Sequence, residues 1–588
     1  MCGIWCLIKA SDVASFPISQ EKATALVAKL ESRGPEGTRI QTFLDQVMLG
    51  FTRLAINGLS EAGMQPFIDG DIVTICNGEI YNYKEIAAKY NFTLTTGSDC
   101  EVLPQLYNHF IERTELFWRE LDGVFAAVVL DLKRRTLMVG RDPYGVRPLF
   151  IGACPSNSRF SDYELLGFSS ELKGLADINE LESIHQFSPG HYHTYDLESL
   201  NLIDRTKYHI YPDDQTIIAQ MSDQTISDVE AAKKNLRIAL KAAVHKRMLT
   251  ERPVAALLSG GIDSSLIAAL VAEELRAAKS PPLKTFSIGF AGSEDLRYAR
   301  MVADHIGSEH YEIIKTPEEF FAAIPEVIRD IESFDTTSVR ASVGNWLVAR
   351  EIRRQTDCKV VFNGDGSDEV FGSYMYFYKA PNDEEYEAET IRLLKDICYF
   401  DVLRSDRSIS SHGLEPRTPF LDKTFVQVAH KIAIGLRRPV QGLQVEKWIL
   451  RAAFADTGLL PDAVLWRKKE AFSDGVSGPQ KLWYQEIQER LTTPCITSGP
   501  IGPDEIQERL AAHKSWSHHM PPKTPEDSSC KKERSSTERS SDEDIYYRSI
   551  FESLYKDRSE VIPYKWMPRW IDGATDPSAR TLKVYDEA

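Results

Sequence analysis

The sequence predicts two domains of different fold class: a mainly β domain over residues 2–200 and an α/β domain with a parallel sheet over 229–588, joined by a polar linker over 201–228. Three observations support this prediction. The chain has 588 residues, and a single hydrophobic core does not usually extend over a chain of that length. Short β-rich runs between Gly, Asp and Pro turns fill the first part. After the linker, strand-like runs alternate with longer helical patterns, which is typical of a parallel sheet.

Composition and charge narrow the class of protein. The 69 Lys and Arg residues against 86 Asp and Glu residues give a net charge of -17, which argues against nucleic acid or an anionic membrane as a partner. No apolar run approaches the roughly twenty residues of a membrane helix. The nine cysteines are scattered and odd in number, which is typical of a reducing compartment and argues against a structural metal site. We therefore expect a cytoplasmic enzyme.

The elements of the first domain follow from its residue pattern. Four apolar, β-rich runs are bounded by turn residues: 47–51, 72–76, 125–130 and 137–140. Such runs are typical of strands in a largely antiparallel arrangement. A helix is expected after the Gly-Ser-Asp run at 97–99.

Cys2 is the first candidate catalytic residue. Removal of Met1 would leave a thiol and a free α-amine on one residue. An amine with a pKa of roughly 8 can accept a proton from a thiol whose pKa is about 8.5, and a terminal amine can activate such a nucleophile. Taken alone, an early cysteine is more often a small buried hydrophobic residue, so both interpretations stay open at this point.

Three further segments can form an amino-acid amide site with Cys2. The guanidinium of Arg53 can hold an α-carboxylate, and Asp99 can hold an α-ammonium. The side chain of Asn77 and the N–H of Gly78 can stabilise a tetrahedral oxyanion. Each segment also has a simpler interpretation: a surface ion pair, a helix N-cap and a hairpin turn, respectively.

Five motifs of the first half resemble, in order, the glutamine amidotransferase domain of the N-terminal-nucleophile class: Cys2-Gly3-Ile4, Arg33-Gly34-Pro35, Asn77-Gly78-Glu79, Gly97-Ser98-Asp99 and the run from Arg141 to Pro148. The resemblance implies a four-layer fold with two antiparallel sheets between helices. It also implies that Cys2 is the nucleophile, that its amine is the base, and that Asn77 and Gly78 form the oxyanion hole. Glutamine would be held by the side chains or backbone of Arg53, Asn77, Gly78, Glu79 and Asp99.

The second domain opens with a candidate phosphate-binding loop. A helix predicted over 229–249 precedes a strand over 254–258, and the run Ser-Gly-Gly-Ile-Asp-Ser-Ser at 259–265 opens a helix that continues over 264–278. Two glycines let the backbone approach an anion, three hydroxyls can donate to it, and the helix N-terminus adds unpaired N–H groups. Because Asp263 would repel phosphate, we expect Mg²⁺ between them. The alternative is a plain strand-to-helix turn.

A second acidic loop follows the predicted strand over 360–362. It reads Asn-Gly-Asp-Gly-Ser-Asp-Glu from Asn363 to Glu369. Carboxylates this close repel one another unless water or a metal ion intervenes, and α/β sheets place ligands at this end of their strands. On an exposed turn the same residues would be ordinary. We expect Asp263 and Asp368 to carry Mg²⁺ on ATP.

Eight segments, taken with the first domain, resemble the glutamine-hydrolysing asparagine synthetases: 259–265, 285–289, 337–342, 363–369, 412–422, 446–447, 469–475 and 574–580. The resemblance covers nearly the whole chain and fails mainly at the polar run 515–544, for which we predict a disordered insertion. It implies a second domain of the PP-loop ATP-pyrophosphatase type, and a homodimer. The implied reaction has two steps: aspartate attacks ATP to give β-aspartyl-AMP, and ammonia from Cys2, crossing an apolar channel, displaces AMP.

The resemblance also assigns residues to the substrates of the second domain. The expected ATP-binding residues are Leu257, Ser259, Gly260, Gly261, Asp263, Ser264, Ser265, Ile288, Asn363, Gly364 and Lys469. The expected aspartate-binding residues are Thr337, Ser338 and Arg340, of which the arginine suits a carboxylate.

Asp365 marks the sharpest departure from the family pattern. The family usually reads Ser-Gly-Glu-Gly where this chain has Asn-Gly-Asp-Gly at 363–366. That Glu is associated with positioning the intermediate or accepting a proton from ammonia, so Asp365 is a candidate catalytic residue. Its carboxylate is withdrawn by one methylene, about 1.5 Å, and we expect synthetase activity that is reduced but real.

Three other functions share part of these features. A transferase that makes amino sugars or purine precursors has the first domain but lacks the 259–265 loop. A β-lactam-forming synthetase has the second domain but does not need Cys2. A sensor that binds nucleotide or glutamine without catalysis would account for Asn363 and Asp365.

Overall fold

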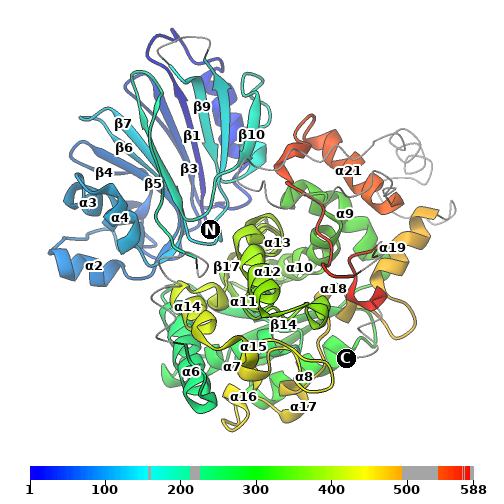
Figure 1. Ribbon diagram of the computed structural model, residues 1–588. Helices are drawn as coiled ribbons and strands as arrows, with labels where there is room; N and C mark the ends of the chain where they lie inside the picture. Colours follow the sequence, from blue (N-terminus) through cyan, green and yellow to red (C-terminus); the bar gives the residue numbers. More distant parts are fainter. Residues whose placement is uncertain (157–160, 212–224, 493–540, 572–573, 575, 583–588) are drawn as a thin grey trace.

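The computed structural model describes residues 1–156, 161–211, 225–492, 541–571, 574 and 576–582, and it shows two domains packed side by side (Figure 1). The first domain is mainly β and the second is α/β, as the sequence predicts. None of the helices in this part of the chain is long and apolar enough to cross a membrane.

The first domain is a four-layer stack of two antiparallel sheets between helices. The sheets have the strand orders β10-β8-β9-β1-β3-β2 and β12-β11-β7-β6-β5-β4. Their strands are β1 (Gly3–Lys9), β2 (Thr38–Phe43), β3 (Val47–Thr52), β4 (Phe67–Asp69), β5 (Ile72–Ile80), β6 (Gly123–Asp131), β7 (Thr136–Arg141), β8 (Phe150–Pro155), β9 (Tyr163–Ser169), β10 (Ser183–Gln186), β11 (His191–Asp196) and β12 (Leu202–Lys207). The helices are α1 (Gln20–Ala28), α2 (Tyr83–Tyr90), α3 (Val102–His109) and α4 (Thr114–Glu120).

Strand β1 shows why these layers form. Its side chains point alternately to opposite faces of the sheet. Ile4, Cys6 and Ile8 lie in the core between the two sheets, whereas Trp5 and Leu7 pack with α1 on the outer face. Helices α3 and α4 cover the outer face of the other sheet. The predicted four-layer fold is confirmed.

The second domain is built on a five-stranded parallel sheet. Its strand order is β15-β14-β13-β16-β17. The strands are β13 (Val254–Leu257), β14 (Lys284–Gly289), β15 (Glu309–Ile314), β16 (Val360–Phe362) and β17 (Glu415–Arg417). The helices are α6 (Val229–Lys246), α7 (Ile262–Ala277), α8 (Glu294–Ile306), α9 (Pro317–Ile331), α10 (Thr336–Gln355), α11 (Ser367–Phe371), α12 (Asp383–Asp396), α13 (Asp401–Ser410), α14 (Lys423–Lys431), α15 (Ile434–Arg437), α16 (Trp448–Phe454), α17 (Asp462–Leu465), α18 (Phe472–Gly475), α19 (Trp483–Thr492) and α21 (Asp542–Leu554).

Helices cover both faces of the parallel sheet, which explains why its central strands β13 and β16 are continuously apolar. Val361 of β16 packs with α9 and α10, while its neighbours Val360 and Phe362 pack with α6 and α7 on the other face. The carboxyl ends of the strands are therefore the open side of the sheet, where the loops after β13 and β16 lie.

Two predicted boundaries need correction. Within the predicted linker over 201–228, residues 202–207 form β12, the edge strand beside β11, and their alternate side chains face solvent, which made them read as polar. Residues 212–224 of that linker, and 515–540 of the predicted insertion, lie outside the described residues. The end of the insertion is helical: Ser541 caps α21, and Asp544 completes the capping box.

Candidate functional site

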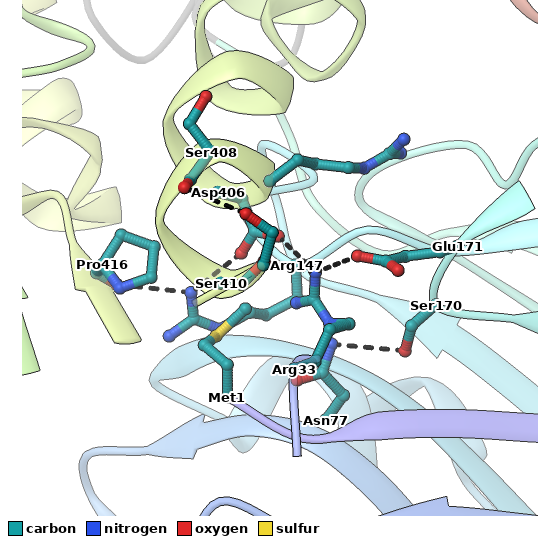
Figure 2. Close-up of polar contacts among 12 residues, drawn as sticks. Met1, Arg33, Asn77, Arg147, Ser170, Glu171, Asp406, Ser408, Ser410 and Pro416 are labelled. Carbon is teal, nitrogen blue, oxygen red and sulfur yellow. Dashed lines mark hydrogen bonds and ion pairs between the residues drawn. The ribbon is translucent and has the colours of Figure 1, made fainter. Parts of the chain in front are cut away.

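Cys2 lies one residue before β1, beside the neighbouring sheet. Its backbone N–H donates to Asn77 Oδ1 at 3.1 Å, and its thiol donates to the Leu54 carbonyl at 3.7 Å. Asn77 Nδ2 lies 3.4 Å from the hydroxyl of Ser170, and both residues are labelled in Figure 2. Burial raises the pKa of the Cys2 thiol to about 11. A nucleophilic thiolate at this position therefore needs a base.

Asn77 and Gly78 do not form the hairpin turn considered above. They continue strand β5, where they pair with Ala126 and Phe125 of β6. A Cβ atom at Gly78 would lie 2.2 Å from the Val124 carbonyl oxygen, so only glycine fits between the strands there. The strand geometry thus fixes both candidate oxyanion residues beside Cys2.

The three side chains expected to hold glutamine are all buried at one end of this domain. Arg53 donates from Nη1 to the Ser60 carbonyl at 2.7 Å and from Nη2 to the Gly58 carbonyl at 2.5 Å. Asp99 accepts the backbone N–H of Ile80 at 2.7 Å. Glu79 precedes Ile80 in β5, so both carboxylates lie at the same end of that strand.

Electrostatics make this pair of carboxylates suited to a cation. Burial raises the pKa of Glu79 well above its usual value, Asp99 and Glu415 raise it further, and Arg417 opposes them. Burial also raises the pKa of Asp99 to about 6, although the hydrogen bond from the Ile80 N–H lowers that pKa. Two buried carboxylates of like charge are costly until a cation such as an α-ammonium arrives.

Met1 occupies a buried position at the boundary between the domains. It is 1% exposed, and its terminal amine lies 3.5 Å from Glu415 Oε2 of β17. Figure 2 shows it beside Arg33 and Arg147. Cleavage of the Met1–Cys2 bond would leave the Cys2 amine where the peptide N–H now meets Asn77.

A buried ion-pair cluster joins the two domains beside Met1 (Figure 2). Arg33 Nη1 of the first domain lies 2.9 Å from Glu171, 2.9 Å from Asp406 of α13 and 2.8 Å from the Ser410 hydroxyl. Arg147 donates to the Pro416 carbonyl at 3.3 Å. These side chains are charged, so an apolar passage for ammonia stays a prediction at this boundary.

The loop after β13 has the geometry of an anion cradle. Ser259 and Ser264 share a hydrogen bond at 3.0 Å between their hydroxyls, and Gly261 donates its N–H to Ser259 Oγ at 3.3 Å. Helix α7 starts at the next residue, so its free N–H groups face the same space. Asp263 contributes a buried Oδ1 without a hydrogen-bond partner among the described residues.

Lys447 lies between the two loops. Its ammonium is 2.6 Å from Asp263 Oδ2 and 2.7 Å from Asp368 Oδ1, and Lys469 is 2.6 Å from Asp368 Oδ2. Burial alone would raise the pKa of Asp368, but the two lysines outweigh it and lower that pKa. Asp263 and Asp368 thus share the ammonium of Lys447, and their expected role in carrying Mg²⁺ on ATP stays a prediction.

The donor set still fits Mg²⁺ held mainly by substrate. In the described part of the chain, no three His, Cys, Asp or Glu side chains are arranged around a metal position. Mg²⁺ is commonly bound by one or two carboxylates together with substrate phosphates. The unpartnered Oδ1 of Asp263, at the mouth of the phosphate loop, is the oxygen that fits this role.

Most of the residues expected to bind ATP, aspartate or Mg²⁺, and the candidate catalytic residue Asp365, line one pocket at the carboxyl ends of the strands. They are Leu257, Ser259, Gly261, Asp263, Ser264, Ile288, Thr337, Ser338, Asn363, Gly364, Asp365, Asp368 and Lys469. Two others support the loop instead. Gly260 has a φ of 73°, and a Cβ there would lie 2.4 Å from Tyr298. Ser265 faces the core and is 0% exposed.

Both domains of the chain have relatives among known proteins. A family model described as asparagine synthase matches residues 235–389 and 379–566, and one described as a glutamine amidotransferase domain matches residues 1–208. The glutamine-hydrolyzing asparagine synthetase of Gallus gallus is 40% identical over 605 aligned residues, covering 100% of both chains. That of Homo sapiens is 39% identical with the same coverage. The chain belongs to the glutamine-hydrolysing asparagine synthetase family.

A solved structure shares less with the chain. Glutamine phosphoribosylpyrophosphate amidotransferase from B. subtilis is 13% identical, with a TM-score of 0.29, covering 53% of this chain and 91% of that chain. A score this low supports no argument.

Arg340 is not among the described residues that line the pocket of the second domain, and its role in binding aspartate stays a prediction. Its guanidinium pairs with Glu543 of α21, and Nη2 lies 2.7 Å from Asp576. The residues of α10 that line the pocket are Thr337, Ser338, Ala341, Asn345 and Val348. With about 100° per residue, Arg340 falls to the side of that face, so it anchors the C-terminal segment.

Asp365 is held by an arginine that sequence reasoning missed. Its Oδ1 lies 3.1 Å from Arg404 Nη2 of α13, and its Oδ2 is buried without a partner among the described residues. Arg404 also lies 2.9 Å from Asp401. Asn363 donates from Nδ2 to the Ser405 hydroxyl at 2.7 Å. Helix α13 therefore positions both residues at which this synthetase departs from its family.

Several pocket residues gave no signal strong enough to assign from sequence. Arg467 pairs with Asp295 at 2.7 Å and lies 3.4 Å from the Ser259 carbonyl, so it supports the phosphate loop. The basic run Arg467-Lys468-Lys469 is only a weak sign of phosphate binding in the sequence, although all three residues line the pocket. Trp566 reaches the pocket from the C-terminal segment, which no local pattern predicts.

Proposed function

We propose that the protein makes asparagine from aspartate, ATP and glutamine, with ammonia as the shared intermediate. The full-length identity to glutamine-hydrolyzing asparagine synthetases supports this proposal most strongly. The two sites supply the groups that such a reaction needs. The first has a buried thiol beside Asn77, the candidate oxyanion residue, and the second has a candidate phosphate-binding loop at the carboxyl ends of parallel strands.

At the first site, Cys2 attacks the side-chain amide of glutamine after removal of Met1. Its α-amine takes the thiol proton, which the raised pKa of the buried thiol makes necessary. The Asn77 side chain and the Gly78 N–H stabilise the oxyanion. Arg53 holds the α-carboxylate, and Glu79 with Asp99 holds the α-ammonium.

At the second site, the chain's residues orient ATP and aspartate for attack at the α-phosphorus. Ser259, Gly261 and Ser264 hold the pyrophosphate part, and Lys469 neutralises charge as it leaves. Mg²⁺, held by Asp263 with phosphate oxygens, would offset phosphate charge. Aspartate lies along Thr337 and Ser338. Ammonia then displaces AMP from β-aspartyl-AMP, and Asp365, which lines the same pocket, is the proposed base for that step.

A product assay tests the proposal. Purified protein with aspartate, ATP, MgCl₂ and either glutamine or ammonium chloride should release AMP and asparagine in equal amounts. Cys2→Ala should abolish only the glutamine-dependent reaction. Glutamate without asparagine would contradict the proposal, whereas ATP binding without release of AMP or glutamate would favour a sensor.

The remaining expectations are part of the same proposal. We expect a homodimer, a cytoplasmic location and dependence on Mg²⁺. Light scattering, fractionation of cells and titration with a chelator measure these three properties. A monomer at assay concentration would remove the first expectation without affecting the reaction.

A further inference from the structure

The candidate glutamine site is completed by a strand of the other domain. Strand β17 lies at the edge of the parallel sheet, and its first and third residues, Glu415 and Arg417, point the same way. Both are 1% exposed. Glu415 Oε2 lies 3.5 Å from the terminal amine of Met1, and Arg417 Nη2 lies 3.6 Å from Glu79 Oε2.

Arg417 is fixed from its own side of the boundary. Its Nη1 donates to the carbonyls of Arg247 and, at 2.7 Å, Leu249, and its Nε donates to Glu415 Oε1 at 2.9 Å. Its Nη2 is buried and makes no well-aligned hydrogen bond to any described residue, although Glu415 Oε1 lies 2.9 Å away. The guanidinium is thus held rigidly, with one nitrogen available toward Glu79.

Glu79 has one oxygen committed and one available. Asn57 Nδ2 donates to its Oε2 at 2.7 Å, and Arg417 approaches the same oxygen. An α-ammonium group can therefore be accepted by Oε1 without displacing either partner. Removal of Arg417 would take away the guanidinium 3.6 Å from Glu79 and leave that carboxylate close to Asp99 and Glu415, of which only Glu415 keeps an arginine, Arg147 at 3.7 Å.

We infer that Arg417 is a positioning residue of the glutamine site, supplied across the domain boundary to balance Glu79 while that carboxylate binds the α-ammonium of glutamine. The inference rests on the proposed function and extends it, because it makes the first site dependent on the second domain. Arg417 touches no reacting atom, so its effect is on glutamine affinity and on the pH at which glutamine binds.

The direction of the pH effect follows from the groups that face Glu79. Asp99 and Glu415 raise the pKa of Glu79, as burial does, whereas Arg417 and, until Met1 is removed, the Met1 amine lower it. The other titratable groups coupled to it are Cys2, Tyr83 and Cys100. Without Arg417, Glu79 would be protonated at higher pH, and the acid limb of kcat/KM for glutamine would move to higher pH.

The test is Arg417→Met in the full-length protein, assayed for glutamate release without ATP and for asparagine formation from glutamine and from ammonia. We expect the KM for glutamine to rise by about tenfold or more, the acid limb to shift upward, and ammonia-dependent synthesis to stay within about twofold. Arg417→Lys, which keeps a charge, should recover part of the affinity. The matched control is Arg252→Met, which breaks another cross-boundary pair, to Glu36 at 3.0 Å.

Two results would overturn the inference: an unchanged KM and acid limb in Arg417→Met, or an equal loss of glutamine-dependent and ammonia-dependent synthesis. If Arg417→Met does not fold, Arg417→Lys and a cycle with Glu79→Gln decide instead, because the Arg417 change should add less than about twofold once Glu79 is neutral. Absence of asparagine from the unmodified protein would count against the proposed function alone, since glutamate release still measures the KM for glutamine.

Discussion

Asp365 gives the most direct test of the second site. Asp365→Asn keeps the shape of the side chain and removes its charge, so the contact between Oδ1 and Arg404 at 3.1 Å loses its ionic partner. A hydrogen bond to a charged group contributes about 1.5–3 kcal/mol. If that charge acts in the transition state, kcat for asparagine formation should fall by about 10- to 100-fold.

Asp365→Glu tests the length of the same side chain. The added methylene moves the carboxylate by about 1.5 Å, toward the position that the family's usual Glu would occupy. Misplacement of about 1 Å can cost about a hundredfold, so we expect activity to hold or rise. The Oδ2 of Asp365 is buried and has no hydrogen-bond partner among the described residues, so its movement breaks no hydrogen bond there.

The assay compares asparagine, AMP and glutamate from the same reaction. Both variants should leave glutamate release unchanged, because Asp365 lies in the pocket of the second domain. Unaltered asparagine formation in Asp365→Asn would refute the reasoning about charge. A fall in Asp365→Glu would show that Arg404 and Asp365 are matched in length, and that the expected defect does not exist.

Three more predictions concern other charges. Lys447→Met should raise the KM for ATP about tenfold or more, because Asp263 and Asp368 lose the buried ammonium that lies between them. Titration with ATP measures this KM. Glutamine-dependent kcat/KM should fall as pH drops through about 6, where Asp99 becomes protonated, and a flat profile would contradict its role. Arg340→Met removes the partner of Glu543, at a cost of about 3–5 kcal/mol, so limited proteolysis should cut the C-terminal segment faster.

The fold followed from local patterns because each pattern has a direct physical cause. The predicted strand over 360–362 is β16 in full, and the predicted helix over 229–249 is α6 with a slightly shorter end. Continuous apolar runs between helical segments occur where both faces of a sheet are covered. The strand β12 was missed because an edge strand with one solvated face resembles a polar connection.

The site could be predicted only as far as the motifs carry it. The loops after β13 and β16 meet because parallel strands place their carboxyl ends together, and the sequence indicates this directly. The partners of Arg340 could not be found in the same way, since Glu543 and Asp576 are about two hundred residues away along the chain. Lys447 was visible in a motif, but only the folded chain shows that its ammonium lies between Asp263 and Asp368.

Strand β17 limits how freely this glutamine-hydrolysing domain can be transplanted. Residues 1–207 of the chain contain both antiparallel sheets, which suggests that the first domain could be moved as a unit into another protein. The guanidinium beside Glu79 comes from Arg417, however, and so does not move with that domain. A chimera that joins the domain to a different ammonia acceptor would need an arginine at an equivalent edge strand before it could use glutamine well.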